Sequence, residues 1–409
     1  MKSRCTIAVL LILLLLLSSG PAARLRRTRA AHARESRVPY SHAAASPDTP
    51  KNVDGPEQLP FDFAPNTAQD EASTVFGTPA PLVTQSSAAG GWQTECVDCP
   101  RYFSSMANRS LQLDDDGHPC IAYGGDGLYY AWYNGAEWQY ETVDSAPRVG
   151  HYASLALDTA GYPHISYYDG TNDDLKYAYR AGNIWHVQTV DSEGVVGGHT
   201  SLALDAAGNP HISYYDGSND DLKYAHWTGS AWDIQTVDSE GVVGAFASLA
   251  LDAADNPHIS YSYFGISGKS NVALKYAHWT GSVWDIQTVD SEGSVGTYTS
   301  LVLDSAGHPH ISYYNGSTSD LKYARWTGSA WDIQTVDSDG SVGWDSALAL
   351  DPEGHPHISY MDHTELRLKY AYWTSHDWDI QIVDDSEFVG WATSLALDGA
   401  GHPHISYHD

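Results

Sequence analysis

Basic residues are scarce in this chain. Its 409 residues include 21 Lys and Arg against 51 Asp and Glu, a formal net charge of −30. In residues 91–409 the imbalance is 12 against 44. Such a surface repels the phosphates of nucleic acids, so we exclude a nucleic-acid partner. The charge fits a highly soluble protein that meets cations or neutral glycans.

Long apolar runs are absent beyond the first twenty residues. Ile7–Leu17 is a short apolar run, preceded by Lys2 and Arg4 and followed by the small residues Ser18–Gly20, which is the pattern of a secretory signal peptide. No later run approaches the roughly 20 apolar residues of a membrane-spanning helix. We therefore predict a signal peptide over 1–23 and a secreted, periplasmic or extracellular protein without a membrane span.

Aromatic residues are sparse in residues 24–90, which are rich in Ala, Ser, Pro and Thr. This segment cannot bury enough apolar surface to offset the entropy cost of ordering it, so a disordered linker is predicted. The remaining residues, 91–409, form the predicted folded domain.

Cysteine is rare as well, with four residues in the chain, of which Cys5 falls in the signal peptide. Cys96 and Cys99 form a C-V-D-C pair, and Cys120 stands alone. A disulfide is favoured over zinc, because the compartment is oxidising and two further ligands at metal spacing are absent. Cys96, Cys99 and Cys120 are the disulfide candidates, and one of them stays unpaired or bonds elsewhere.

What the sequence does contain is a repeat. From Ser110 onward the motif S-L-A-L-D-x-x-G-x-P-H-I-S-Y-Y-D recurs seven times, and L-K-Y-A-x-W-x-G-x-x-W-D-I-Q-T-V-D lies between copies. The prolines of the P-H-I-S segments are 44, 47, 47, 52, 47 and 47 residues apart. A period of this length is typical of repeat arrays and propellers.

Each period contains four short segments with strand composition. In the second copy they are Ser154–Asp158, His164–Asp169, Leu175–Arg180 and Trp185–Asp191, and none has a helical apolar period. Four antiparallel strands per repeat predict an all-β fold, a β-propeller of about seven four-stranded blades. A β-solenoid is the alternative, although its repeats are usually shorter.

The two ends of the domain each carry part of a repeat. Trp92–Asp98 matches the fourth strand, and Ser394–Asp409 supplies the first and second. We predict that both termini assemble a seventh, incomplete blade whose third strand has no counterpart in this sequence, and a truncated C-terminus is one explanation.

The copies differ most at two positions after the connector V-D-S-E-G-V-V-G. In propellers the connector from strand four to the next strand one crosses one face beside the central channel, so these positions should ring its mouth. The predicted ligand-binding residues are His151, Tyr152, His199, Phe246, Tyr298, Trp344, Asp345 and Trp391, joined by Asp169 and Asp216 from the loops between strands two and three. Aromatic faces cover the apolar face of a sugar while carboxylates accept its hydroxyl protons. The alternative is that these residues only cap the inner strands.

The His of P-H-I-S recurs in six copies, which favours a core residue paired with a neighbouring strand over a catalytic or zinc-binding one. The acidic segments D-S-E-G and D-G-S-N-D-D do not match the twelve-residue calcium loop, so calcium is only an alternative and no cofactor is predicted.

The turn A-x-W-x-G-x-x-W between strands three and four resembles the Asp-box turn, S-x-D-x-G-x-T-W, of sialidase-like propellers, although Thr228 or Thr280 stands near the place of its Asp. The overall plan also resembles the fucose-lectin propellers, whose sugar sites lie among aromatic residues of successive blades. The sialidase resemblance implies three arginines that grip a substrate carboxylate, a Tyr–Glu nucleophile pair and an Asp acid. The candidate arginines are Arg101, Arg109, Arg148, Arg180, Arg325 and Arg367.

Recurring carboxylates without a unique pair argue against glycoside hydrolysis, which needs two carboxylates at a defined separation. We therefore expect a secreted, non-catalytic and monomeric propeller that binds a glycan or another cell-surface ligand. A sialidase-like glycoside hydrolase and an envelope protein-interaction scaffold are the alternatives.

Overall fold

The computed structural model describes residues 84–85, 91–98, 109–265, 272–386 and 388–408. The predicted signal peptide and, apart from Thr84–Gln85, the predicted linker lie outside these residues. The described part is all strand and turn and contains no helix. It therefore includes no helix that is long and apolar enough to cross a membrane.

The strands form six four-stranded antiparallel sheets, one two-stranded sheet and a short separate pair. The first two sheets are β3 (Leu111–Leu113), β4 (Pro119–Gly124), β5 (Leu128–Tyr133), β6 (Trp138–Asp144), and β7 (Val149–Leu157), β8 (Pro163–Asp169), β9 (Asp174–Ala181), β10 (Ile184–Asp191). The next two are β11 (Val196–Leu204), β12 (Pro210–Asp216), β13 (Asp221–Trp227), β14 (Trp232–Asp238), and β15 (Val243–Leu251), β16 (Pro257–Tyr263), β17 (Ala273–Trp279), β18 (Trp284–Asp290). The fifth and sixth are β19 (Val295–Leu303), β20 (Pro309–Asn315), β21 (Asp320–Trp326), β22 (Trp331–Asp337), and β23 (Val342–Leu350), β24 (Pro356–Asp362), β25 (Arg367–Trp373), β26 (Trp378–Asp384). The two-stranded sheet is β27 (Trp391–Leu397) with β28 (Pro403–His408), and the separate pair is β1 (Thr84–Gln85) with β2 (Thr94–Glu95).

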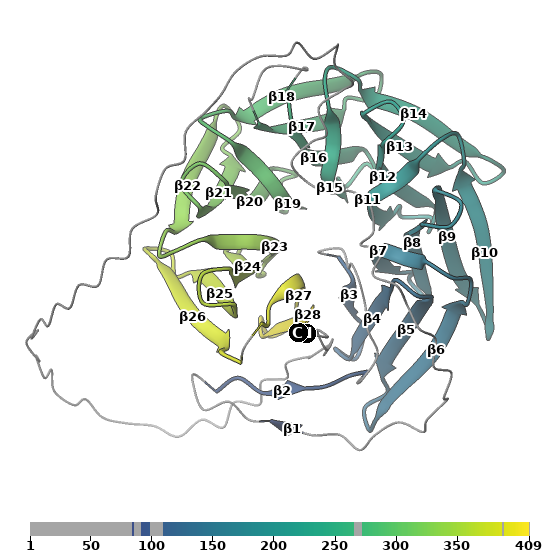
Figure 1. The fold of residues 1–409 in the computed structure, drawn as a ribbon, viewed down its shortest axis with the longest axis horizontal. Coiled ribbons are helices and arrows are strands. Elements are labelled where there is room, and N and C mark those ends of the chain that lie inside the picture. The colour runs from purple at the N-terminus through teal and green to yellow at the C-terminus, as the bar shows by residue number, and fades with distance from the viewer. Residues whose placement is uncertain (1–83, 86–90, 99–108, 266–271, 387, 409) are drawn as a thin grey trace, which may run out of the picture. The chain divides into compact units, whose positions relative to one another are not determined.

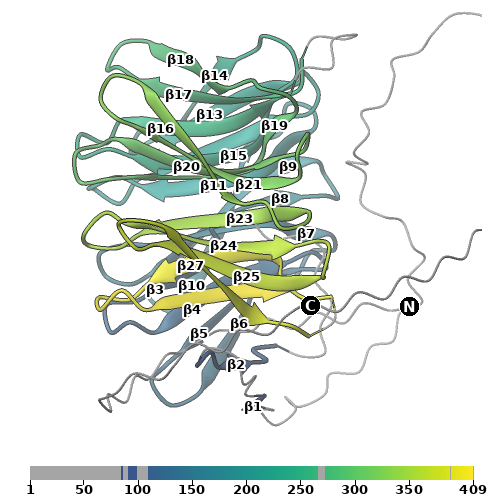
Figure 2. The same ribbon diagram turned by 90° about the vertical axis from the view of Figure 1, so that its left-hand side faces the viewer.

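The sheets stand around a common axis, with the first strand of each innermost and the fourth outermost (Figure 1). In both views the sheet β27–β28 lies between β23–β26 and β3–β6 (Figure 1, Figure 2). Serine hydroxyls connect neighbouring inner strands: the amide of Leu249 donates to Ser201 at 3.0 Å, and the amide of Leu111 donates to Ser394 at 3.1 Å. The second bond joins β27 to β3 and closes the circle of inner strands.

The β-propeller prediction is confirmed, and its blade count is confirmed for six complete blades. The seventh sheet has two strands in the described part of the chain. The predicted bounds of the inner strand are wrong: β7 begins at Val149, five residues before Ser154. The variable pair therefore lies inside this strand, where the register shifts on both sides of His151. A bulged strand keeps its pairing through such an irregularity, and composition alone does not reveal it.

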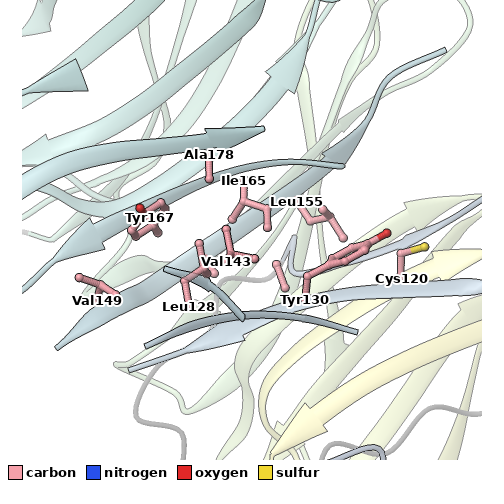
Figure 3. Packing of buried hydrophobic residues seen from close by; sticks show 11 residues of the cluster. Cys120, Leu128, Tyr130, Val143, Val149, Leu155, Ile165, Tyr167 and Ala178 are labelled. Atoms are coloured by element: carbon pink, nitrogen blue, oxygen red, sulfur yellow. The ribbon is translucent and has the colours of Figure 1, made fainter. Parts of the chain in front are cut away.

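Apolar side chains fill the space between neighbouring sheets. Between the first two sheets, Leu128 and Tyr130 pack against Leu155, Ile165 and Tyr167 (Figure 3). The outer strands contribute an indole to this contact, as when Trp185 meets Tyr130 edge to face at 5.7 Å between ring centroids. The same contact recurs at each later interface, so one packing solution is repeated around the axis.

A buried ion pair crosses each of five interfaces. The Asp that ends an outer strand accepts the hydroxyl of a Tyr and the ammonium of a Lys from the next sheet, as Asp191 does from Tyr214 at 2.7 Å and Lys223 at 2.8 Å. Burial alone would raise the pKa of Asp191, but these two donors and a backbone amide outweigh it and lower the pKa. We call this Asp–Tyr–Lys arrangement the latch; its other aspartates are Asp144, Asp238, Asp290 and Asp337.

The recurring histidine is a core residue, as predicted. His211 is buried, and its Nδ1 hydrogen-bonds the hydroxyl of Tyr224 on the adjacent strand. The same pairing joins His164, His258, His310 and His357 to tyrosines of their own sheets. Burial is the largest cause that lowers the pKa of these imidazoles, to about 4 for His258.

Candidate functional site

From the second sheet to the fifth, the second residue of the variable pair contacts its counterpart in the next sheet. Ring centroids are 4.6 Å apart for Tyr152 and His199, 4.5 Å for His199 and Phe246, and 4.7 Å for Phe246 and Tyr298. Tyr298 continues to Trp344 at 5.4 Å. The structure thus gathers residues from five inner strands into one continuous row.

The backbone conformation determines the direction in which these side chains point. Tyr152, His199, Phe246, Tyr298, Asp345 and Ala392 all have φ between 49° and 55°, the left-handed region that side-chain-bearing residues rarely occupy. Because the conformation recurs in six sheets, it belongs to the geometry of the repeat. The bulge turns one side chain per sheet toward its neighbours, and the identity of that side chain is free to vary.

The row ends in a cluster of larger rings. Trp344 stacks on His363, with centroids 4.6 Å apart and planes inclined by 19°. His363 meets the ring of Trp391 edge on at 5.8 Å, and Trp344 also contacts Tyr314 at 5.4 Å. We call Tyr152, His199, Phe246, Tyr298, Trp344, His363 and Trp391 the aromatic row. All seven are partly exposed.

Asp345 lies beside this row. Its Oδ2 accepts the amide of Ala392 at 3.0 Å. Burial raises the pKa of this carboxyl to about 6, and the Ala392 amide offsets only part of that effect. Asp345 therefore changes charge near pH 6, beside the aromatic row.

We expect Asp345→Asn to remove one pH-dependent contribution to stability. The folded-state pKa of about 6 lies above the ordinary value of 3.8, so the carboxyl is tolerated when protonated and becomes costly as pH rises through 6. The variant should be about 3 kcal/mol more stable than the wild type at pH 7, and the difference should become small near pH 4. Urea denaturation of both proteins at pH 4, 5, 6 and 7 measures it. A constant difference across this range would contradict the assignment.

The two loop aspartates of the predicted site, Asp169 and Asp216, lie elsewhere. Asp169 and Asp216 are 1% and 0% exposed. Asp216 accepts the amides of Ser218 and Asn219 at 3.0 and 3.1 Å, so it holds the turn after β12. The structure therefore does not present these carboxylates to a ligand. His151 is also buried, at 8% exposure, against Tyr168.

The candidate arginines contact different partners. Arg180 pairs with Glu141 at 3.1 Å, and Arg367 pairs with Asp362 at 3.1 Å. Arg109 extends from β3 to the other side of the ring axis, where it contacts Ser248 and the carbonyl of Leu301. Burial lowers the pKa of Arg109 to about 10. These side chains belong to different sheets and form no convergent trio; Arg101 lies outside the described residues.

The cysteines divide into two kinds. Cys96 is disulfide-bonded, and Cys99 lies outside the described residues. Cys120 is a free, buried thiol, so its place among the disulfide candidates is not supported. It takes the position of the core histidine in the first sheet, and burial raises its pKa to about 11, which keeps it protonated.

No group of three or more His, Cys, Asp or Glu side chains in the described part of the chain is placed to hold a metal ion. The paired histidines of H-P-H instead complete turns, as His355 does with Asp351 at 3.0 Å. Thr228 takes the role expected of the box Asp, since its hydroxyl and the carbonyl and amide of Ala231 bond across the turn.

One surface depression, of about 660 Å³, lies at the opposite end of the sheets from the aromatic row. It is lined by turn residues of the fifth and sixth sheets, among them Asp304, His308 and Arg325. Asp304 accepts from His308, and Arg325 is paired with Asp332 at 3.1 Å. Because these charged groups already have partners, the aromatic row is the stronger candidate.

Sequence reasoning found six of the seven members of the aromatic row by their variability. It noted His363 only as a loop residue and could not find Tyr314, because Tyr314 belongs to the repeated S-Y-Y motif. Its position against Trp344 follows from the bulge rather than from any local signal.

No family model matches the chain, and no curated protein matches it. Among solved structures, an ulvan lyase of a polysaccharide lyase family is similar over 75% of this chain and 91% of its own, with 14% identity and a TM-score of 0.57. AofleA from Arthrobotrys oligospora matches over 70% and 89%, with 13% identity and a TM-score of 0.47. The six-bladed fucose-recognising lectin of Aleuria aurantia matches over 62% and 86%, with 17% identity and a TM-score of 0.40. The likeness to the lyase is one of fold, and with the sheet order above it identifies the chain as a repeat β-propeller.

Proposed function

We propose that the protein binds carbohydrate through the aromatic row, without catalysing a reaction on it. The observation that carries this proposal is the continuous contact of seven partly exposed rings from Tyr152 to Trp391. Ring faces pack against the C–H face of a sugar, while a few polar groups fix its orientation. Solved propellers of similar fold include an ulvan lyase, whose name indicates a polysaccharide substrate.

The charge of the chain restricts the class of glycan that can bind. The domain carries 44 acidic against 12 basic residues, and Asp345 lies at the row itself. Sulfated or sialylated glycans would meet a repulsive field, so the ligand class we propose is a neutral glycan. We further propose that the protein is secreted, since residues 1–23 have the pattern of a signal peptide.

We infer that the sheet β27–β28 and the segment 92–98 belong to one seventh blade. Trp92 contacts Tyr370 edge to face at 5.2 Å and donates to Gln381 at 3.1 Å, as Trp378 donates to Gln334 at 3.3 Å one sheet earlier. On its other side, Trp138 donates to Glu95 at 2.9 Å. The segment thus makes the contacts of a fourth strand toward both neighbours.

Trp344→Ala is expected to weaken binding of a neutral glycan by about tenfold, since one lost ring contact is worth roughly 1.5 kcal/mol. Tyr162→Ala is the control, because Tyr162 is an exposed aromatic residue, at 39%, on a turn at the opposite end of the sheets. The measurement is a glycan array that holds neutral, sulfated and sialylated chains, followed by calorimetry with the best ligand.

Three results would contradict the proposal. They are equal loss in both variants, preference for anionic glycans, or an array without any signal, which would favour a protein-interaction scaffold. Turnover of a fluorogenic glycoside panel would overturn the non-catalytic assignment alone.

A further inference from the structure

Asp345 places a carboxylate where the other sheets have none. The same left-handed position of the bulge is occupied in the other five sheets by Tyr152, His199, Phe246, Tyr298 and Ala392. The Oδ2 of Asp345 accepts the amide of Ala392 at 3.0 Å, and the described residues make no hydrogen bond to its Oδ1. The side chain is partly exposed. One carboxylate oxygen is therefore available to a ligand.

No positive charge in the described ranges compensates this carboxylate. Burial raises the pKa of Asp345 to about 6 and the amide of Ala392 lowers it in part, whereas no Lys, Arg or His contributes. At pH 7 the group is ionised. Each latch aspartate, in contrast, pairs with a Lys ammonium. A carboxylate that is ionised in a partly buried place without such a partner is costly, and a cation from outside the chain would compensate it.

Four aromatic rings are grouped next to this carboxylate. Trp344 precedes it in the chain, and the ring centroid of Trp344 is 5.4 Å from those of Tyr298 and Tyr314. Tyr298 also contacts Phe246 at 4.7 Å. Burial, and next the charge of Asp345, raise the pKa of Tyr298, so the carboxylate is close enough to act on this ring. The planes of the three neighbouring rings are inclined to that of Tyr298 by 32° to 65°, so none of them stacks on it.

Inclined rings beside an uncompensated carboxylate are suited to an organic ammonium ion. The negative face of an aromatic ring attracts a cation, and an ionised carboxylate accepts its strongest hydrogen bonds. The 44 acidic against 12 basic residues of 91–409 also attract cations to the domain. We propose that Asp345, with the rings of Tyr298 and Trp344, binds an organic ammonium group. The carboxylate is its counter-ion, and the rings contact its alkyl groups.

This proposal goes beyond glycan binding and does not rest on it, because a neutral sugar needs the rings but not the carboxylate. An ammonium group can reach the site on an amino sugar of a glycan or on a small alkylammonium compound such as choline. The two sources share the charge and the adjoining C–H groups, and they differ in what else the site contacts.

The test is titration calorimetry on the full chain with two matched pairs of probes. Choline is compared with dimethylbutanol, which replaces its nitrogen with carbon, and oligomers of glucosamine are compared with those of N-acetylglucosamine. The charged member of at least one pair should bind at least about tenfold more tightly, as expected for a cation–π contact in a partly desolvated site. A preference within the first pair alone identifies a small compound, and one within the second pair identifies an amino sugar.

Asp345→Asn is the decisive variant. It removes the charge, keeps an oxygen for the amide of Ala392, and should abolish the preference for the charged probe. Asp233→Asn is the control, because Asp233 is a carboxylate on the outer strand β14 whose side chain is 48% exposed. The control variant should bind as the wild type does. Tyr298→Leu keeps apolar bulk but removes the ring, and should weaken binding of the charged probe about fivefold.

Equal binding of the charged and neutral probes, or no binding of any of them, would overturn the proposal. A preference that survives in Asp345→Asn, or that falls equally in Asp233→Asn, would overturn it as well, since the general negative charge of the domain would then explain it. The glycan array separates this failure from that of the proposed function. Neutral glycans bound without any preference for ammonium refute the present proposal alone, and ammonium binding with a silent array refutes glycan binding alone.

Discussion

The protein is expected to lose stability steeply between pH 6.5 and pH 4. Burial is the largest cause that holds the pKa of His258 at about 4, against 6.5 for an ordinary imidazole. The same cause lowers the pKa of His164, His211, His310, His357 and His404. In the unfolded chain these imidazoles protonate below pH 6.5, whereas the folded protein resists protonation. Stability is therefore complete above pH 6.5 and is lost as pH falls toward the depressed values.

The expected size of this effect is large. His258 alone contributes about 3 kcal/mol by pH 4, from 1.36 kcal/mol per pKa unit. The same cause lowers the pKa of the other five imidazoles, so their losses add to that of His258. A typical protein is stable by roughly 5–15 kcal/mol, so unfolding in mild acid should follow. Over part of this range, protonation of Asp345 raises the stability of the folded protein as pH falls. This is the effect of one carboxyl group against that of six imidazoles.

Urea denaturation midpoints at pH 7, 5.5 and 4.5 measure this prediction. His258→Gln should have a smaller pH dependence than the wild type, because one titrating group is gone. The control is His186→Gln, since His186 is exposed on the outer strand β10. A midpoint that stays constant from pH 7 to pH 4.5 would refute the role of the buried imidazoles.

Asp337→Asn is expected to destabilise the protein by about 3 kcal/mol or more, as breaking a buried ion pair does. Asp337 lies 2.6 Å from the Nζ of Lys369, which is 5% exposed, and accepts the hydroxyl of Tyr360 at 2.7 Å. Burial alone would raise the pKa of Asp337, but Lys369, a backbone amide and Tyr360 together lower it. The variant leaves the ammonium with Asp362 alone, at 3.7 Å.

The neighbouring blade supplies a matched control for this variant. Asp384 holds the equivalent position and accepts from Tyr407 without a Lys partner among the described residues. Asp384→Asn should therefore cost only about 1 kcal/mol, the value of one hydrogen bond. Guanidinium denaturation of both variants at pH 7 gives the two numbers. Equal losses would show that the ion pair adds nothing to the Tyr–Asp bond.

The repeat made most of the fold predictable. The prolines, the D-x-x-G-x-P turns and the two-residue alternation of each strand are local signals, and they recur often enough to fix the sheet order. The core histidine was predictable for the same reason, since repetition excludes a unique catalytic environment. The bulge at His199 was not, because its left-handed backbone depends on pairing with β12 rather than on the local residues.

The candidate site was predictable in part. Variation among copies located Tyr152, Phe246 and Tyr298, whose side chains the repeat does not constrain. It also favoured Asp169 and Asp216 as ligand contacts, whereas the structure buries both. A carboxylate that holds a turn and one that faces solvent look alike in sequence. The neighbours of the site, such as Tyr314, lie in repeated motifs and needed the three-dimensional structure.

The latch also determines what a single repeat can do by itself. Its carboxylate lies on one sheet, and its hydroxyl and ammonium lie on the next, so each of the five boundaries between complete blades passes through an ion pair. An excised blade would expose an unmatched anion on one flank and an unmatched cation on the other. The sequence is therefore modular, but the stability of each repeat depends on its neighbours. The ring should unfold as one cooperative unit rather than blade by blade.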